Sequence, residues 1–136
     1  MTYYKAILAC VAVIFAELVF ADDATSNPAL KQFMATVVAP ASNVVFGVAN
    51  EAPKDDAGWA VVEKNALLLA ELAKQIQKMS PADHDAWDKQ VGLLVERASI
   101  AATAAKSHDA DKISDIGNDI YETCAGCHTA YPVKPK

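Results

Sequence analysis

The sequence predicts an all-α protein folded as a four-helix bundle. Alanine and leucine are abundant, the 136 residues include only 5 glycines, and no stretch alternates with the two-residue period of a strand. Apolar residues instead recur every three or four positions in four segments, which is the spacing of helices that bury one face. Because short loops separate these segments, the simplest arrangement is an antiparallel up-down-up-down bundle.

The first helical segment is predicted to begin at Ser26-Asn27-Pro28, where a capping residue precedes proline at the first helical position. Pro40 interrupts this segment, so a kink is expected within the preceding turn. Its apolar stripe consists of Leu30, Phe33, Met34, Val37, Ala41, Val44, Val45 and Val48.

The second segment is predicted to start near Asp55–Asp56, and the third at Ser80-Pro81-Ala82-Asp83, which places an acidic group in its first turn. Both carry apolar residues in alternating steps of three and four, as helices of a bundle do. The two stripes are Trp59, Val62, Ala66, Leu69, Ala73 and Ile76, and Trp87, Val91, Leu94, Ala98, Ala101 and Ala105.

The fourth segment, from about Asp109 to Pro132, carries the most informative motif, Cys124-Ala125-Gly126-Cys127-His128. C-x-x-C-H is the attachment signature of a c-type haem. Two thiols on one face of a helix can form thioethers with the two haem vinyl groups, and the histidine that follows can bind the iron. The motif therefore predicts one covalently attached haem c, held by Cys124 and Cys127, with His128 as the proximal iron ligand.

Met1–Ala21 is predicted to be a cleaved signal peptide, because Lys5 precedes a short apolar run that ends in small residues; an uncleaved membrane anchor is the alternative. Cleavage leaves one domain, residues 22–136, and removes Cys10. With only the two motif cysteines remaining, a disulfide scaffold is excluded. Covalent haem attachment in bacteria takes place outside the cytoplasm, so a periplasmic location is expected.

The chain is acidic, with a net charge of −5 that is unchanged when Lys5 and Glu17 leave with the signal peptide. A nucleic-acid partner is disfavoured because no basic face is present. The charge suits a soluble carrier that meets positively charged patches on its partners.

In an up-down-up-down bundle, the end of the fourth helix lies beside the start of the first helix, the end of the second and the start of the third. The haem is therefore expected at that end. Met34, Met79 and His84 are the candidates to face the iron opposite His128, unless no side chain does so. His108 precedes His128 by about 20 residues, or roughly 30 Å of helix, and is expected to be remote from the iron.

Several of these residues also have simpler interpretations. Met34 lies within an apolar stripe, where methionine commonly fills core space, so it is either core or the distal iron ligand. His84 lies between two aspartates and is expected at the surface. Trp87 and Tyr121 are at core spacing, and both are candidates to pack against the haem.

Together, the signal peptide, the four-helix pattern and the C-x-x-C-H-x-x-Y sequence from Cys124 to Tyr131 resemble the class II c-type cytochromes. This family includes the cytochromes c′ and the low-spin cytochromes of the c-556 type. The resemblance implies a haem packed within a four-helix bundle, with a first-helix residue on the distal side of the iron. That residue is methionine in low-spin members, and Lys31-Gln32-Phe33-Met34 resembles the segment that carries it. Pro132 departs from the family, in which a basic residue often follows the tyrosine.

Two functions follow from the two possible states of the iron. With both His128 and Met34 as ligands, the protein is a one-electron carrier between redox partner proteins. With a five-coordinate iron, as the resemblance to cytochromes c′ implies, it binds a diatomic gas such as nitric oxide or carbon monoxide. We favour the carrier. Enzymatic turnover is not expected, since the only arginine, Arg97, lies mid-helix and forms no peroxidase-like pair with a distal histidine.

A homodimer is a further hypothesis. The apolar runs Val37-Val38 and Leu67-Leu68-Leu69 exceed what one buried stripe requires. The resemblance supports the same hypothesis, because bundles of this family often pair through their first two helices.

Overall fold

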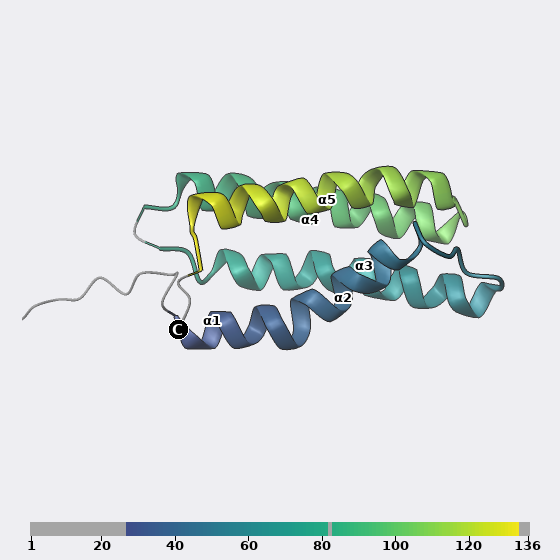
Figure 1. Ribbon diagram of the computed structural model, residues 1–136, viewed down its shortest axis with the longest axis horizontal. Coiled ribbons are helices and arrows are strands. Elements are labelled where there is room, and N and C mark those ends of the chain that lie inside the picture. Colours follow the sequence, from purple (N-terminus) through teal and green to yellow (C-terminus); the bar gives the residue numbers. More distant parts are fainter. Residues whose placement is uncertain (1–26, 82, 134–136) are drawn as a thin grey trace, which may run out of the picture.

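The computed structural model describes residues 27–81 and 83–133, of which about 80% are helical and none is in a strand. The elements are α1 (Pro28–Phe33), the π-helical turn η2 (Met34–Val38), α2 (Ala39–Gly47), α3 (Asp56–Gln77), α4 (Asp85–Lys106) and α5 (Ala110–Ala130). The first three follow one another without a break, so the described chain forms four helical segments packed together, as predicted (Figure 1). None of the helices in this part of the chain combines the length and apolar character needed to cross a membrane. The predicted signal peptide lies outside the described residues.

Side-chain caps begin three of the four segments where the sequence predicted. Asn27 accepts hydrogen bonds from backbone N–H groups of the first turn at 3.0 and 3.2 Å, and Pro28 occupies the first helical position. Asp55 and Asp109 cap α3 and α5 in the same way, at 2.8 and 2.9 Å. Each cap satisfies an amide that has no partner within its own helix.

The start of α4 differs from the prediction. The helix begins at Asp85 rather than at Ser80–Asp83, and its N-cap residue, His84, makes no side-chain capping bond. The physical reason is tertiary: the backbone carbonyl of Asp83 accepts a hydrogen bond from the hydroxyl of Tyr131, 48 residues away. A capping pattern of a few neighbouring residues contains no information about a partner so far along the chain.

The kink expected before Pro40 is present as the π-helical turn η2. Pro40 has no amide hydrogen, so the carbonyl of Thr36 cannot receive the usual bond from four residues ahead. In the turn before Pro40, the amide of Ala39 donates to the carbonyl of Met34, five residues earlier, which is the hydrogen bond of a π-helix. The segment changes direction there, between α1 and α2 (Figure 1). The wide turn thus begins at Met34, the residue that the sequence singled out.

The predicted stripes supply most of the core, but four residues of the first stripe are only half-buried: Phe33, Met34, Val37 and Val44. All six stripe positions of α3 and all six of α4 are buried, together with Ile113, Ile116 and Ile120 of α5. α3 packs against α4, α4 against α5, and α2 against α3 and α5. In contrast, α1 and η2 make at most marginal backbone contacts with α3, α4 and α5. The bundle is therefore tightly packed along most of its length and looser beside α1 and η2.

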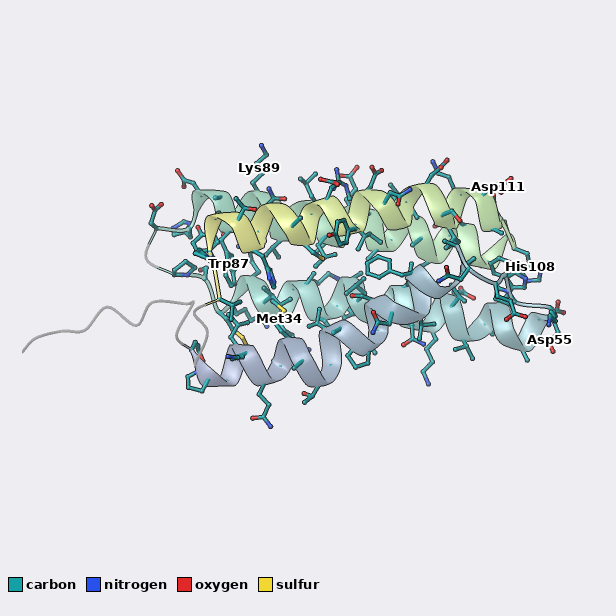
Figure 2. All side chains as sticks on the ribbon, viewed as in Figure 1. Met34, Asp55, Trp87, Lys89, His108 and Asp111 are labelled. Atoms are coloured by element: carbon teal, nitrogen blue, oxygen red, sulfur yellow. The ribbon has the colours of Figure 1, made fainter. Side chains whose placement is uncertain are left out.

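The two ends of the bundle carry different side chains. Met34 and Trp87 lie toward one end, whereas Asp55, His108 and Asp111 lie at the other (Figure 2). The ring of His108 stacks on Trp59, with ring centroids 5.2 Å apart and planes 9° from parallel. His108 therefore lies at the opposite end of the bundle from Met34 (Figure 2).

Ile120 and Ile100 offer a matched test of this packing. The side chain of Ile120, on α5, is fully buried, whereas 36% of Ile100, on α4, is exposed. Ile120→Ala should lower the free energy of unfolding by about 2–5 kcal/mol, because it leaves a cavity in the core. Ile100→Ala should lower it by less than about 1 kcal/mol. Urea denaturation followed by circular dichroism measures both values, and equal losses would contradict the packing described.

Candidate functional site

The C-x-x-C-H motif occupies the last two turns of α5. This helix ends at Ala130, and the amide of Tyr131 donates to the carbonyl of Cys127 at 2.8 Å, which closes the final turn. Pro132 follows and cannot continue the helix. The cysteines therefore lie on a regular helical framework, and His128 lies within one turn of its end.

Two adjoining cavities border the motif. The main cavity, of about 270 Å³, is lined by residues of α1, η2, α4 and the end of α5, among them Leu30, Met34, Trp87, Cys127, His128 and Tyr131. The minor cavity, of about 40 Å³, is lined by Met34, Val38, Ile76, Gln90, Val91, Leu94, Thr123, Cys124, Cys127 and His128. Met34, Cys127 and His128 border both cavities, so the two form one continuous site with mainly apolar walls.

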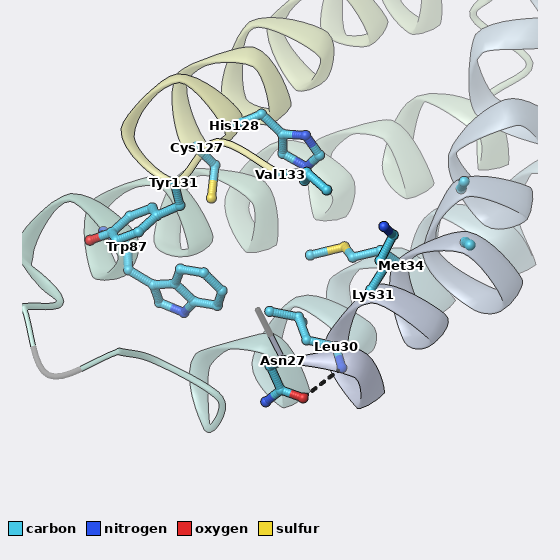
Figure 3. Close-up of a pocket in the computed structure, with 11 residues that line it drawn as sticks. Asn27, Leu30, Lys31, Met34, Trp87, Cys127, His128, Tyr131 and Val133 are labelled. Atoms are coloured by element: carbon cyan, nitrogen blue, oxygen red, sulfur yellow. Dashed lines mark hydrogen bonds between the residues drawn. The ribbon is translucent and has the colours of Figure 1, made fainter. Parts of the chain in front are cut away.

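Met34 and His128 face the main cavity from different helices. Met34 extends from η2 and His128 from α5, with the Cys127 sulfur directed into the space beside them (Figure 3). The site therefore brings together a thioether, an imidazole and a thiol from segments that are about 90 residues apart in the chain. The second thiol, Cys124, lies in the wall of the minor cavity.

Trp87 forms a rigid part of the cavity wall. Only 2% of its surface is exposed, and its indole N–H donates to the carbonyl of Ile76 at 3.1 Å. This bond satisfies the one polar group of a side chain that is otherwise buried among apolar atoms. Tyr131 packs edge-on against the indole ring, with ring centroids 5.2 Å apart. The indole therefore holds one orientation at the cavity that also contains the motif.

Tyr131 joins the motif to the start of α4. Its hydroxyl donates to the carbonyl of Asp83 at 2.8 Å and accepts the backbone N–H of Trp87 at 3.3 Å. The second bond satisfies a first-turn amide of α4. The N-cap residue, His84, makes no side-chain hydrogen bond of this kind. The sequence indicated Tyr131 only as the last residue of the C-x-x-C-H-x-x-Y motif. Its place three residues after His128 was the available signal, but its partners could not be read from the sequence.

Gly126, between the two cysteines, packs closely under Gln90 of α4. A Cβ atom at this glycine would lie 2.7 Å from Gln90 Nε2 and 3.1 Å from its Cδ, closer than such atoms normally approach. Gln90 also lines the minor cavity. Sequence reasoning did not single out Gln90, since nothing in its local pattern indicates contact with α5.

The two thiols are half-buried and not joined in a disulfide. Burial raises the pKa of Cys124, and burial together with the proximity of Cys124 raises the pKa of Cys127. Redox pairs of the thioredoxin type have a lowered thiol pKa at a helix N-terminus, whereas this motif lies at the negative, C-terminal end of its helix. Both observations disfavour a dithiol redox role.

The remaining candidates do not reach this site. Tyr121, proposed as a haem contact, is 63% exposed and lines a different cavity with Val45 and Phe46. His84 is exposed and lies 2.8 Å from a carboxylate oxygen of Asp88. Met79 packs against the core and lines none of the cavities described. Of the residues proposed to pack against a haem, the structure therefore brings Trp87 to the site and leaves Tyr121 outside it.

Comparison with known proteins adds nothing to this description of the site. No protein-family model, curated protein or solved structure matches the chain. Within residues 27–81 and 83–133, no group of three or more histidine, cysteine, aspartate or glutamate side chains is placed to hold a metal ion together. The interpretation of the site therefore depends on its own geometry and on the C-x-x-C-H motif.

Tyr131→Phe tests the connection between the motif and α4. Loss of the hydroxyl leaves the Asp83 carbonyl and the Trp87 amide without this partner, so we expect a loss of about 1–2 kcal/mol in unfolding free energy. Tyr121→Phe, the matched control at an exposed tyrosine, should change the value by less than about 0.5 kcal/mol. Denaturation midpoints at unchanged slope provide the measurement. Equal effects at the two tyrosines would argue against the junction.

Proposed function

We propose that this protein is a one-electron carrier of the class II c-type cytochrome kind, with one covalently attached haem c. The observation that carries the proposal is the presence of Met34 and His128 in one apolar cavity beside Cys127. An imidazole and a thioether are the axial ligands of low-spin electron-transfer cytochromes. The donor set and the apolar walls thus fit a c-type haem, and the C-x-x-C-H sequence supplies its attachment points.

Each residue of the site has a defined task in this proposal. Cys124 and Cys127 would hold the haem through thioether bonds, and His128 and Met34 would supply the imidazole and thioether ligands of its iron. The haem iron, when bound, supplies the change between Fe³⁺ and Fe²⁺. Met34 favours the reduced form, because a thioether ligand raises the reduction potential. Trp87 and Leu30 exclude water from the cavity walls, which acts in the same direction.

The proposal extends to the topology and the location of the protein. We place the four segments in antiparallel up-down-up-down order, which short connections such as Ser107–Asp109 favour. We place the mature protein, residues 22–136, in the bacterial periplasm, where C-x-x-C-H sequences acquire haem. Its partners are then redox proteins, and it needs no substrate of its own. The side chain of Arg97 donates to the Asp119 carbonyl and the Thr123 hydroxyl of α5, and we assign it no part in an enzymatic reaction.

The alternative function is binding of nitric oxide or carbon monoxide at a five-coordinate iron. The minor cavity supports it, because Val38, Ile76 and Leu94 give apolar walls next to Met34. Such walls would suit a small, uncharged gas. The two functions differ in whether Met34 is an iron ligand, and one substitution separates them.

Met34→Ala is the decisive experiment, with Met79→Ala as its control at a methionine outside the cavities. The purified protein should contain covalent haem and show a low-spin spectrum with the methionine–iron charge-transfer band. Met34→Ala should abolish that band and produce a high-spin species that binds carbon monoxide, whereas Met79→Ala should retain the wild-type spectrum. A wild-type protein that is high-spin and binds carbon monoxide would instead support the gas-binding function. Absence of covalent haem would contradict both.

We also propose that the protein forms a homodimer through α3 and the first helical segment. Leu67 and Leu68 are 51% and 39% exposed, although leucine is usually buried. Sedimentation velocity at micromolar concentration should give a dimeric mass, and Leu67→Asp combined with Leu68→Asp should give a monomer. Ile100→Asp, which changes an exposed residue of α4 in the same way, should remain dimeric. A monomeric wild-type protein would exclude this proposal.

A further inference from the structure

Arg97 is the only arginine of the chain, and it links α4 to the helix that carries the motif. One guanidinium nitrogen, Nη1, donates to the backbone carbonyl of Asp119 and to the hydroxyl of Thr123. Thr123 is 2% exposed, and its hydroxyl also donates to the Asp119 carbonyl at 2.9 Å. The guanidinium is therefore held against one turn of α5 rather than extended into solvent.

This turn adjoins the candidate site. Thr123 precedes Cys124 directly and lines the minor cavity itself. On α4, Leu94 lies one turn before Arg97 and lines the same cavity. The guanidinium thus binds a residue of the cavity wall.

The positive charge of Arg97 is not neutralised by an ion pair within the described residues. Both acceptors of Nη1 are uncharged, and no carboxylate in this part of the chain lies within 4.0 Å of the guanidinium nitrogens. Arg97 is half-buried, so water screens its charge less than that of an exposed lysine. Arginine side chains carry a positive charge throughout the physiological pH range.

We propose that Arg97 raises the reduction potential of the haem site by placing a fixed positive charge beside the Cys124 turn. This inference rests on the proposed function. Oxidation of the iron adds one positive charge to the site, and a nearby cation makes that change less favourable. Arg97 therefore favours the reduced state through its field, in addition to the effect of the Met34 ligand.

The test is the reduction potential of purified holoprotein, measured by spectroelectrochemical titration. Arg97→Met removes the charge and should lower the equilibrium constant for reduction by about threefold to tenfold, where tenfold corresponds to about 59 mV for one electron. Arg97→Lys keeps the charge and should stay near the wild-type potential. Lys106→Met removes an exposed charge from the last turn of α4 and should leave the potential unchanged.

The outcomes separate a charge effect from a structural one. Equal potentials in wild type and Arg97→Met, or equal decreases in Arg97→Met and Arg97→Lys, would overturn the inference. If Arg97→Met does not retain haem, Thr123→Val decides. This variant removes one of the two acceptors of Nη1, so it should hold the guanidinium less firmly beside the Cys124 turn and lower the potential. A wild-type value would overturn the inference. If the wild-type protein shows the methionine–iron band and Arg97→Met has the same potential, only this inference is contradicted. If the wild-type protein carries no covalent haem, the proposed function is contradicted as well.

Discussion

Pro40 imposes the constraint on which the candidate site depends. Because its nitrogen carries no hydrogen, the helix before it cannot keep regular hydrogen bonding and widens into the π-helical turn η2. The direction of the segment changes there, so α2 packs on α3 and α5 while α1 and η2 do not. The main cavity occupies the resulting space, and Met34 lies at the first position of the turn. A regular helix through this region would allow α1 to pack like α2 and would reduce that space.

Tyr131 fixes the opposite wall of the cavity. One hydroxyl group provides a donor for the Asp83 carbonyl and an acceptor for the Trp87 amide, and its ring packs against the indole. The end of α5 and the beginning of α4 are thereby determined together. His128, three residues earlier, takes its position from the same junction. Different interactions thus determine the two sides of the cavity. On one side the amide hydrogen missing from Pro40 bends the helix, and on the other the hydroxyl of Tyr131 joins α4 to α5.

Interactions within a single helix were predictable from the sequence. Interactions between helices were predictable only where the order of the helices in the bundle determines which helix ends are neighbours. Asn27, Asp55 and Asp109 cap their helices through bonds within three residues, so short patterns were enough. Bundle order placed Met34 near His128. The predicted start of α4 was wrong because the hydroxyl that binds the Asp83 carbonyl belongs to Tyr131, 48 residues away. Tyr121 was a candidate to pack against the haem because it lies one turn before Cys124. A helix rotates about 100° per residue, however, so Tyr121 lies on a different face from its buried neighbour Ile120 and is exposed.

The residues between Cys124 and Cys127 are not an inert spacer. Gln90 and Thr123 are the polar members of an otherwise apolar minor-cavity wall that also borders the cysteines and His128. Gln90 keeps its position because Gly126 has no side chain. A methyl group at Gly126 would displace the Gln90 amide, the flexible end of its side chain, and would change how polar that wall is. The size of one residue inside the motif therefore determines where a polar side chain of another helix lies in the cavity wall, so side-chain volumes at 90 and 126 are constrained as a pair.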